Sequence, residues 1–190
     1  MNIQYIENEE FKGINFIEKG LNIGEYEYCT FTNCSFYNFN LGGITFSECV
    51  FENCDLSMAN LEHTSLKNVK FKNCKLLGLQ FNKCTPFLLS FSFEDCVLNF
   101  SSFYKLKIKN TQFKNCKLEE VDFVEANLTS SIFKNCDFIK AKFNNTLLEK
   151  CDLRSSYNFS INPETNKITN AKFSVNTISG LLDTYKIIIE

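Results

Sequence analysis

The 190-residue sequence lacks most of the features that mark metal sites, nucleotide sites and membrane proteins. It has one histidine, His63, no Cys-X-X-Cys pair and no glycine-rich phosphate loop, so both the ligands of a zinc site and a backbone cradle for phosphates are missing. No segment approaches 18 consecutive apolar residues, and the opening MNIQYIENEEF has neither the basic nor the apolar region of a signal peptide. We therefore expect a cytoplasmic protein with no cofactor, no metal and no membrane segment.

A repeat of 20 residues runs through most of the chain. The string FKNCKL occurs at residues 71–76 and again at 113–118, and related strings begin at Phe31, Phe51, Phe93 and Phe133. Successive starts are 20, 20, 22, 20 and 20 residues apart. A period of this length is typical of stacked structural units in which each unit contacts only its neighbours.

A finer period of five residues lies inside each repeat. Apolar centres, all Phe or Leu except Tyr26 and Ile108, recur every five residues over 11–81, miss once at Pro86, and resume over 93–153. An amphipathic helix needs apolar residues at i, i+3, i+4 and i+7, and a half-buried strand needs alternation, so neither explains the pattern. The period indicates a turn at every repeat. The residue two before each centre is small, as at Cys29 and Ala59, and we interpret it as a second inward position.

This pattern resembles the A(D/N)Lxx grammar of the pentapeptide repeat family over about residues 11–157. The resemblance implies that four repeats make one coil of a square-sectioned solenoid. We therefore predict an all-β, right-handed quadrilateral β-helix of about seven coils, with a short C-terminal helix and strand. The expected organisation is an N-terminal cap at 1–10, a solenoid at 11–157 with a two-residue insertion near 86–92, and a loop, a last partial coil and a dimerisation tail at 158–190.

A four-sided coil stacks residues that are 20 apart into columns, and the sequence contains such columns. The predicted core columns are Phe31, Phe51, Phe71, Phe93, Phe113 and Phe133, and Cys34, Cys54, Cys74, Cys96, Cys116 and Cys136. All ten cysteines occupy the small inward position. We interpret them as buried, reduced thiols that act as small hydrophobic side chains, because a reducing cytosol disfavours disulfides.

Charge is distributed unevenly along the chain. Residues 1–57 hold nine acids and two lysines (−7), residues 58–117 hold three acids and ten lysines (+7), and residues 118–190 hold ten acids and eight bases (−2). We call six lysines of the central and following repeats the basic girdle: Lys70, Lys72, Lys75, Lys114, Lys117 and Lys134.

Two phrases, CDLSMANL at 54–61 and LEKCDLRSS at 148–156, together with a long rod that ends in an apolar tail, are similar to the quinolone-resistance branch of the family. That resemblance implies a DNA mimic that binds DNA gyrase or topoisomerase IV and forms a homodimer through its C-terminal segment. The acidic N-terminal coils and the insertion then supply the expected partner contacts: Glu48, Glu52, Asp55, Pro86, Phe87 and Leu88.

The C-terminal tail carries an apolar pattern of its own. Ile178, Leu181, Leu182 and Tyr185 fall at i, i+3, i+4 and i+7, which predicts a helix near residues 175–185, and the residues after it predict a short strand. Such a tail either caps the last coil, as every solenoid requires, or joins two rods. We favour a dimer interface formed by Ile178, Leu181, Leu182, Tyr185, Ile187, Ile188 and Ile189.

Two other functions remain open, and catalysis is not expected. A protein-interaction scaffold would use an outward apolar stripe of Ile17, Tyr37, Met58, Leu77, Phe100 and Ile139. A nucleic-acid binder would use the basic girdle, but the sequence pI is near 5.6 and the aromatic residues point inward. An enzyme is disfavoured because His63 falls at an outward turn and every cysteine points into the rod, away from any substrate.

Overall fold

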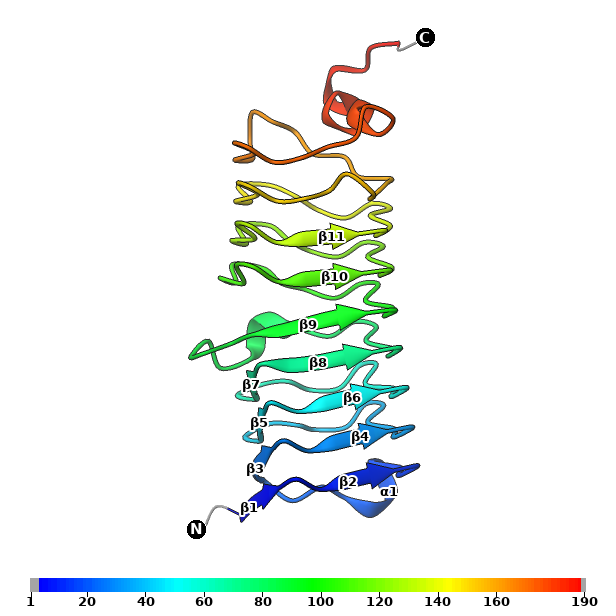
Figure 1. Cartoon of the computed structure of the whole chain (residues 1–190), viewed down its shortest axis with the longest axis vertical. Helices are drawn as coiled ribbons and strands as arrows, with labels where there is room; N and C mark the ends of the chain where they lie inside the picture. The colour runs from blue at the N-terminus through cyan, green and yellow to red at the C-terminus, as the bar shows by residue number, and fades with distance from the viewer. Residues whose placement is uncertain (1–3, 189–190) are drawn as a thin grey trace.

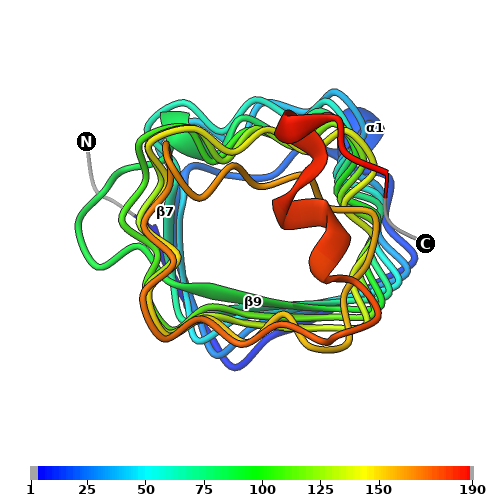
Figure 2. The same cartoon turned by 90° about the horizontal axis from the view of Figure 1, so that it is seen from above.

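The computed structural model describes residues 4–188, which form a parallel β-solenoid with four sides. Figure 1 shows the turns stacked along one axis with the two ends of the chain at opposite ends of the rod, and Figure 2 shows the four-sided cross-section. The predicted all-β quadrilateral solenoid of about seven coils is confirmed. Every strand pairs in parallel with a strand from the turn before or after it.

Two parallel sheets cover two adjacent sides of the rod. The four-stranded sheet has the order β1-β3-β5-β7, and the seven-stranded sheet has the order β11-β10-β9-β8-β6-β4-β2. The first sheet consists of β1 Gln4–Glu7, β3 Gly24–Glu27, β5 Thr45–Ser47 and β7 Ser65–Lys67. The second consists of β2 Glu10–Lys12, β4 Thr30–Thr32, β6 Val50–Glu52, β8 Val69–Lys72, β9 Phe91–Glu94, β10 Gln112–Lys114 and β11 Ile132–Lys134.

We number the sides in chain order. Side 1 is the seven-stranded sheet and side 4 is the four-stranded sheet. Side 2 contains the isolated bridges that join Ser35, Asp55 and Lys75, and side 3 contains the bridge between Asn40 and Asn60. Sides 2 and 4 therefore face in opposite directions.

The phenylalanine column forms the inner lining of side 1. All six predicted phenylalanines are buried, and their backbones pair in register, as Phe31 with Phe51 and Phe51 with Phe71. Their rings stack in parallel, with centroids 4.7 Å apart between Phe31 and Phe51 and 5.3 Å apart between Phe51 and Phe71. Stacked rings at these distances attract one another beyond their burial alone, so the column contributes strongly to the core.

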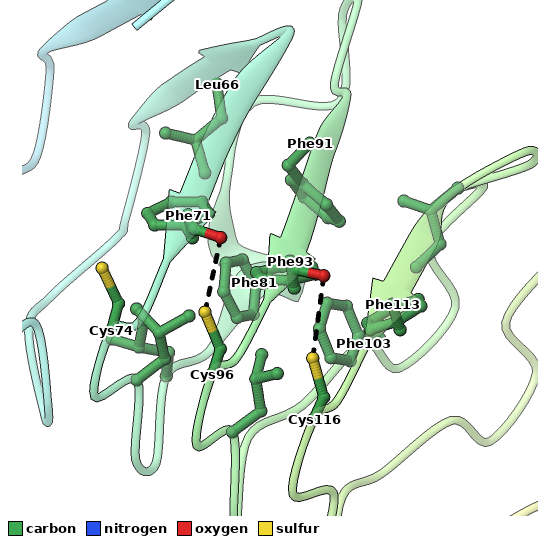
Figure 3. Packing of buried hydrophobic residues seen from close by; sticks show 14 of the residues in the cluster. Leu66, Phe71, Cys74, Phe81, Phe91, Phe93, Cys96, Phe103, Phe113 and Cys116 are labelled. Carbon is green, nitrogen blue, oxygen red and sulfur yellow. Dashed lines mark hydrogen bonds between the residues drawn. The ribbon is translucent and has the colours of Figure 1, made fainter. Parts of the chain in front are cut away.

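The small inward position supplies a hydrogen-bond donor. The thiol of Cys54 donates to the carbonyl oxygen of Phe31 at 3.3 Å, and Figure 3 shows the same contact from Cys96 to Phe71. In other repeats a hydroxyl group at the same position is the donor. The hydroxyl of Thr64, for example, donates to the carbonyl oxygen of Leu41 at 2.9 Å. Because a buried carbonyl without a partner is costly, the position favours a small side chain that can also donate. The sequence pattern alone predicts only that this position is small.

Most corners of the coil place one residue in the left-handed region of backbone conformation. Asn33, Asn38 and Asn53 each have a φ of 54°. Asparagine tolerates this conformation better than most residues because its short polar side chain bonds locally. The corners therefore account for the asparagine that recurs two residues after many centres.

The insertion lies on side 4. A loop projects from the rod there, drawn in green at the left of Figure 2. It lies between Thr85 and Ser90, whose N–H groups still donate to Thr64 and Leu66 of the preceding turn. A 3-10 turn, η1 Phe81–Lys83, precedes this loop on side 3. The register is restored at once, because Phe71 pairs with Phe93 across β8 and β9. The extra residues are thus confined to the loop.

The first turn starts earlier than expected. Residues 4–10 were expected to form a separate cap, but β1 and β2 already pair with β3 and β4, so these residues belong to the solenoid itself. The helix α1, Phe16–Lys19, forms side 2 of this turn, and the side chain of Asn15 caps it by accepting from the N–H of Ile17 at 3.2 Å.

The C-terminal tail is helical, but as 3-10 turns and without the predicted strand. It forms η2, Ile178–Leu181, and η3, Asp183–Tyr185, which end at Lys186 with a φ of 51°. Gly180 explains the close packing, since an added Cβ there would lie 2.1 Å from the carbonyl oxygen of Phe159. Residues 186–188 form no strand, and Ile189 lies outside the described residues. Within residues 4–188, no helix combines the length and the apolar character needed to cross a lipid bilayer.

Candidate binding surfaces

The structure does not bring the three predicted acidic residues together. Glu48 lies at the corner between sides 4 and 1, Glu52 lies on side 1, and Asp55 lies on side 2. Glu52 is in register with Lys72, and Asp55 is bridged to Lys75. Each of these two carboxylates therefore has a lysine one turn away, which reduces the local negative potential.

The projecting loop lies near Glu48 and on the opposite side from Asp55. Pro86 is exposed, and Phe87 and Leu88 are 68% and 62% exposed. Asn68 connects the loop base to Glu48: its side chain donates to Glu48 at 2.6 Å, and its backbone N–H donates to Ser90 Oγ at 2.8 Å. Of the predicted acidic residues, Glu48 is the one that shares a surface with the loop.

A more compact acidic surface was missed by the sequence analysis. Glu7, Glu25 and Glu27 point outward from β1 and β3 on side 4, with Glu7 in register with Glu27, and Glu48 follows one turn later. We call these four residues the acidic end. The hydroxyl of Tyr5 donates to Glu27, and this hydrogen bond raises the pKa of Tyr5 to about 12. The signal in the sequence is the set of acids next to the inward residues of side 4, such as Glu25 and Glu27 on either side of Tyr26.

The basic girdle is divided between two sides of the rod. Lys70, Lys72, Lys114 and Lys134 lie on side 1, whereas Lys75 and Lys117 lie on side 2. Lys114 forms an ion pair with Glu94, which raises the pKa of the lysine. Exposed pairs of this kind contribute little to stability, but they neutralise part of the girdle.

The apolar stripe predicted for a scaffold is exposed along side 2 and its following corner. Ile17, Tyr37, Met58 and Phe100 are each 52% to 57% exposed. Leu77 is half-buried and Ile139 is 37% exposed. Asn99 and Glu119, joined by a hydrogen bond of 3.0 Å, lie between Leu77 and Ile139 in the stacked turns, so polar side chains interrupt the stripe there.

The tail presents its apolar residues in two directions. Leu181 packs against the core, and Leu182 is half-buried, so both help to cover the last turn. Ile178, Tyr185 and Ile187 are about half exposed, and Ile188 is 89% exposed. Val175, which the sequence analysis did not select, is 87% exposed. Tails that only cap a solenoid usually show a polar outer face, so this exposed surface is available for a partner.

His63 and the thiols of Cys49, Cys84 and Cys151 are poorly suited to catalysis. His63 is exposed at a corner, with a φ of 61°. Burial raises the pKa of the Cys49, Cys84 and Cys151 thiols to about 12, so they are protonated at neutral pH. A reactive cysteine needs the opposite, a lowered pKa and an accessible sulfur.

Comparisons with known proteins agree with this architecture. The sequence signature described as the pentapeptide repeat region matches residues 25–86 and 88–159. A trypsin-treated variant of QnrB1, a plasmid-mediated fluoroquinolone resistance protein, superposes with a TM-score of 0.72 at 18% identity, covering 98% of this chain and 92% of that chain. Full-length QnrB1 gives 0.57 at 18% identity, with 97% and 100% covered.

A third similar structure is HetL, a pentapeptide repeat protein involved in heterocyst differentiation regulation from the cyanobacterium Nostoc sp. strain PCC 7120. It superposes with a TM-score of 0.60 at 14% identity, covering 92% of this chain and 89% of that chain. At these identities the likeness concerns the fold alone. Among curated proteins, no sequence shows a significant match.

Proposed function

This chain belongs to the pentapeptide repeat family, and we propose that it is a non-catalytic cytoplasmic rod whose acidic end mimics DNA on DNA gyrase or topoisomerase IV. The repeat phrases and the apolar tail, which are similar to the quinolone-resistance branch, support this assignment. The likeness in fold to QnrB1, a fluoroquinolone resistance protein, extends over almost the whole chain.

The observation that carries the proposal is the charge spacing of the acidic end. Glu7, Glu25 and Glu27 lie on two successive turns of side 4, and Glu48 lies on the next turn at the corner with side 1. Three turns at the usual strand spacing of about 4.8 Å cover roughly 10 Å. One strand of duplex DNA carries a phosphate about every 3.4 Å, or about three over the same length. The acidic end therefore matches the charge density of a single DNA strand over a short distance. Further along side 4, Ser65, Lys67 and Lys107 replace the acids, so mimicry is restricted to this end.

Assembly through the tail would complete the arrangement. We propose that two rods join through Ile178, Tyr185, Ile187 and Ile188, whose side chains are about half exposed or more. A two-fold pairing of this kind is self-complementary. It would place the two acidic ends at opposite tips of a longer rod, where both are free to bind.

A supercoiling assay tests the proposal directly. Purified gyrase is titrated with the protein, with and without ciprofloxacin, and binding is measured separately in competition with linear duplex DNA. We expect duplex DNA to displace the protein, because both occupy the same surface. Supercoiling should change with protein concentration in at least one of the two conditions. Binding that duplex DNA leaves untouched would exclude mimicry.

The exposed apolar stripe supports a second candidate, a protein-interaction scaffold. Tyr37, Met58 and Phe100 would anchor the partner, since exposed aromatic and methionine side chains are favoured at interface centres. Replacing these three residues with Ser distinguishes the candidates. If the acidic end contacts gyrase, the triple Ser variant should still bind gyrase. If the stripe is the contact surface of a scaffold, the variant should no longer bind the partner protein.

A further inference from the structure

The loop on side 4 leaves part of the next turn without a backbone partner. The turn that contains Asn127 and Thr129 shows the normal pairing with the turn before it. The N–H of Asn127 donates to the carbonyl of Leu106 at 2.7 Å, and the carbonyls of Asn127 and Thr129 accept from the N–H groups of Ile108 and Asn110 at 2.9 and 3.0 Å. In the turn that follows the loop, the equivalent groups are the N–H and carbonyl of Lys107 and the carbonyl of Lys109. Within residues 4–188 none of these three groups has a hydrogen-bond partner.

Pro86 accounts for this open edge. It occupies the centre position of the interrupted turn. The N–H of a centre residue on this side normally donates to a carbonyl in the following turn, as the N–H of Ile108 donates to the carbonyl of Asn127 at 2.9 Å. Proline has no N–H, so the bond to the carbonyl of Lys107 cannot form. The chain then leaves the rod as the loop, and the four-stranded sheet ends at β7.

A basic groove lies along the open edge. It has a volume of about 570 Å³ and is bordered by Leu89 and Ser90 of the loop base and by residues 107–112 of the next turn. Lys70, Lys107 and Lys109 line it, and the remaining polar side chains around it are neutral. No carboxylate is among its lining residues, although acids are as common as lysines in the whole chain. The groove is therefore complementary to an anionic ligand.

We propose that this groove binds an extended acidic peptide segment of a partner protein, which adds as a strand to the open edge at Lys107 and Lys109. The peptide backbone supplies a carbonyl for the N–H of Lys107 and N–H groups for the carbonyls of Lys107 and Lys109, as in other cases of strand addition. Alternate residues of a strand point the same way, so carboxylates at every second peptide residue lie beside the outward lysines. No carboxylate of the acidic end lines this groove, although Glu48 accepts a hydrogen bond from the lining residue Asn68 at 2.6 Å, and the proposal does not depend on gyrase binding.

The open edge favours a peptide over a nucleic acid. Three unpaired backbone groups on one edge match the alternating donors and acceptors of another strand, whereas phosphates offer acceptors only. Single-stranded nucleic acids also need exposed aromatic rings for base stacking. Phe87 is exposed, but it is not among the residues that line the groove.

Fluorescence anisotropy with the full-length protein tests the proposal. The probe is a fluorescein-labelled, N-acetylated Glu-Val-Glu-Val-Glu peptide, measured at about 50 mM salt, where screening is weak. The comparison peptides are Lys-Val-Lys-Val-Lys, which reverses the charge, and Glu-Pro-Glu-Pro-Glu, which keeps the acids but lacks two of the N–H groups. An oligothymidylate is the nucleic-acid competitor. We expect the first peptide to bind, and the other two peptides to bind at least about tenfold more weakly.

Matched variants locate the site. K107E/K109E should weaken binding of the acidic peptide at least about tenfold, because two attractions become repulsions. K142E/K150E makes the same charge change at two exposed lysines outside the groove, and it should bind like the wild type. Thermal unfolding curves of both variants should match the wild type.

The proposal is overturned by any of four results: no binding of the acidic peptide, equal binding of the proline peptide, equal loss in both double variants, or displacement by oligothymidylate at equal charge concentration. Salt-sensitive self-association that K107E/K109E abolishes would also overturn it, since a second copy of the chain would then fill the groove.

Discussion

The thiol of Cys96 donates a hydrogen bond to the carbonyl oxygen of Phe71, 3.4 Å away and 25 residues back in the sequence. In the next turn, Cys116 makes the same contact with Phe93 at 3.8 Å, but over 23 residues. The two-residue difference equals the insertion in the loop. The core thus keeps the same contact on both sides of the insertion, which means that the loop adds residues without shifting either column.

The phenylalanine column predicts a large effect for a central substitution. Phe71 is 2% exposed, and its ring stacks on Phe51 at 5.3 Å and on Phe93 at 5.4 Å. Phe71→Ala should lower the free energy of unfolding by about 3 to 5 kcal/mol, because the stacked neighbours cannot close the cavity. Urea denaturation measures the loss. Phe87→Ala, on the exposed loop, is the control and should cost less than about 0.5 kcal/mol. A loss below about 1 kcal/mol for Phe71 would contradict the packing described here.

The buried cysteines predict slow reaction with thiol reagents. All ten are buried and free of disulfides, so reagents in the solvent cannot reach their sulfur atoms while the protein is folded. Native protein at neutral pH should therefore label slowly, and denaturation should release ten reactive thiols. Time-resolved labelling followed by mass spectrometry checks this. Rapid labelling of several cysteines in the native protein would mean that the inward register is wrong.

The same thiols predict a loss of stability at alkaline pH. The folded pKa values of Cys49, Cys84 and Cys151 are about 12, and the unfolded value is about 8.5. A raised folded pKa gives stability that is complete below the unfolded pKa and is lost as pH rises toward the folded value. Each thiol therefore lowers the free energy of unfolding by about 1.4 kcal/mol for every pH unit above about pH 8.5.

Melting temperatures measured from about pH 7 to 10.5 report this loss. C49S/C84S/C151S should melt with a shallower dependence on pH, since serine does not ionise in this range and already fills the same inward position at Ser131 and Ser156. A triple variant with an unchanged slope would show that other groups, such as buried Tyr26, cause the loss.

The tail predicts a homodimer that charged substitutions disrupt. Leu182→Asp combined with Ile188→Asp should give monomers in sedimentation velocity at micromolar concentration. Because Leu182 is half-buried and helps to cap the rod, Ile188→Asp alone is the cleaner test, as that side chain is 89% exposed. Its melting curve should match the wild type. If the wild type already sediments as a monomer, the tail serves only as a cap.

The acidic end predicts which charges matter for gyrase binding. Replacing Glu25, Glu27 and Glu48 with Lys should weaken binding and reduce its dependence on salt, because fewer charge pairs form. The comparison variant changes Glu52 and Asp55 to Lys, on sides 1 and 2, and should have a smaller effect for each charge reversed.

Reversing the girdle gives the opposite test. Replacing Lys72, Lys114 and Lys134 with Glu should strengthen gyrase binding or leave it unchanged, since this extends negative charge along side 1. Surface plasmon resonance at two salt concentrations measures both sets. Loss of binding in the lysine variants, with no effect of the acidic ones, would exclude DNA mimicry by the acidic end.

The core could be predicted from the sequence because the solenoid repeats the same environment in every turn. Residues such as Phe51 and Phe71 are 20 residues apart in the sequence. Because one coil has the same length, residues at this spacing come into contact when the coils stack. The donor role of Cys54 and Thr64 was less visible, since it depends on a carbonyl in the preceding turn and not on composition. The acidic end was missed because Glu7 and Glu27 are 20 residues apart in a column that was not followed outward.

The tail was harder to predict because it follows no repeat. The spacing of Ile178, Leu181 and Leu182 fits an α-helix, but Gly180 packs directly on Phe159 and the turns tighten to i→i+3 bonds, such as Leu182 N to Ser179 O at 2.8 Å. Three residues per turn do not keep such a stripe on one face. Tertiary packing against the last coil therefore determined the local geometry.

The break in the side 4 ladder at Pro86 also bears on how the rod unfolds. In a stacked array, cooperativity depends on the coupling energy between neighbouring turns. The junction below Lys107 lacks the three backbone bonds that the next junction has, so it is the weaker coupling. Chemical denaturation should therefore reach a state in which one block of turns has melted while the other keeps its native hydrogen-exchange protection, with the boundary at this junction. The backbone bonds that cross this junction on the other sides, as between β8 and β9, remain, so we expect a weakened coupling at a single proline and not a complete break.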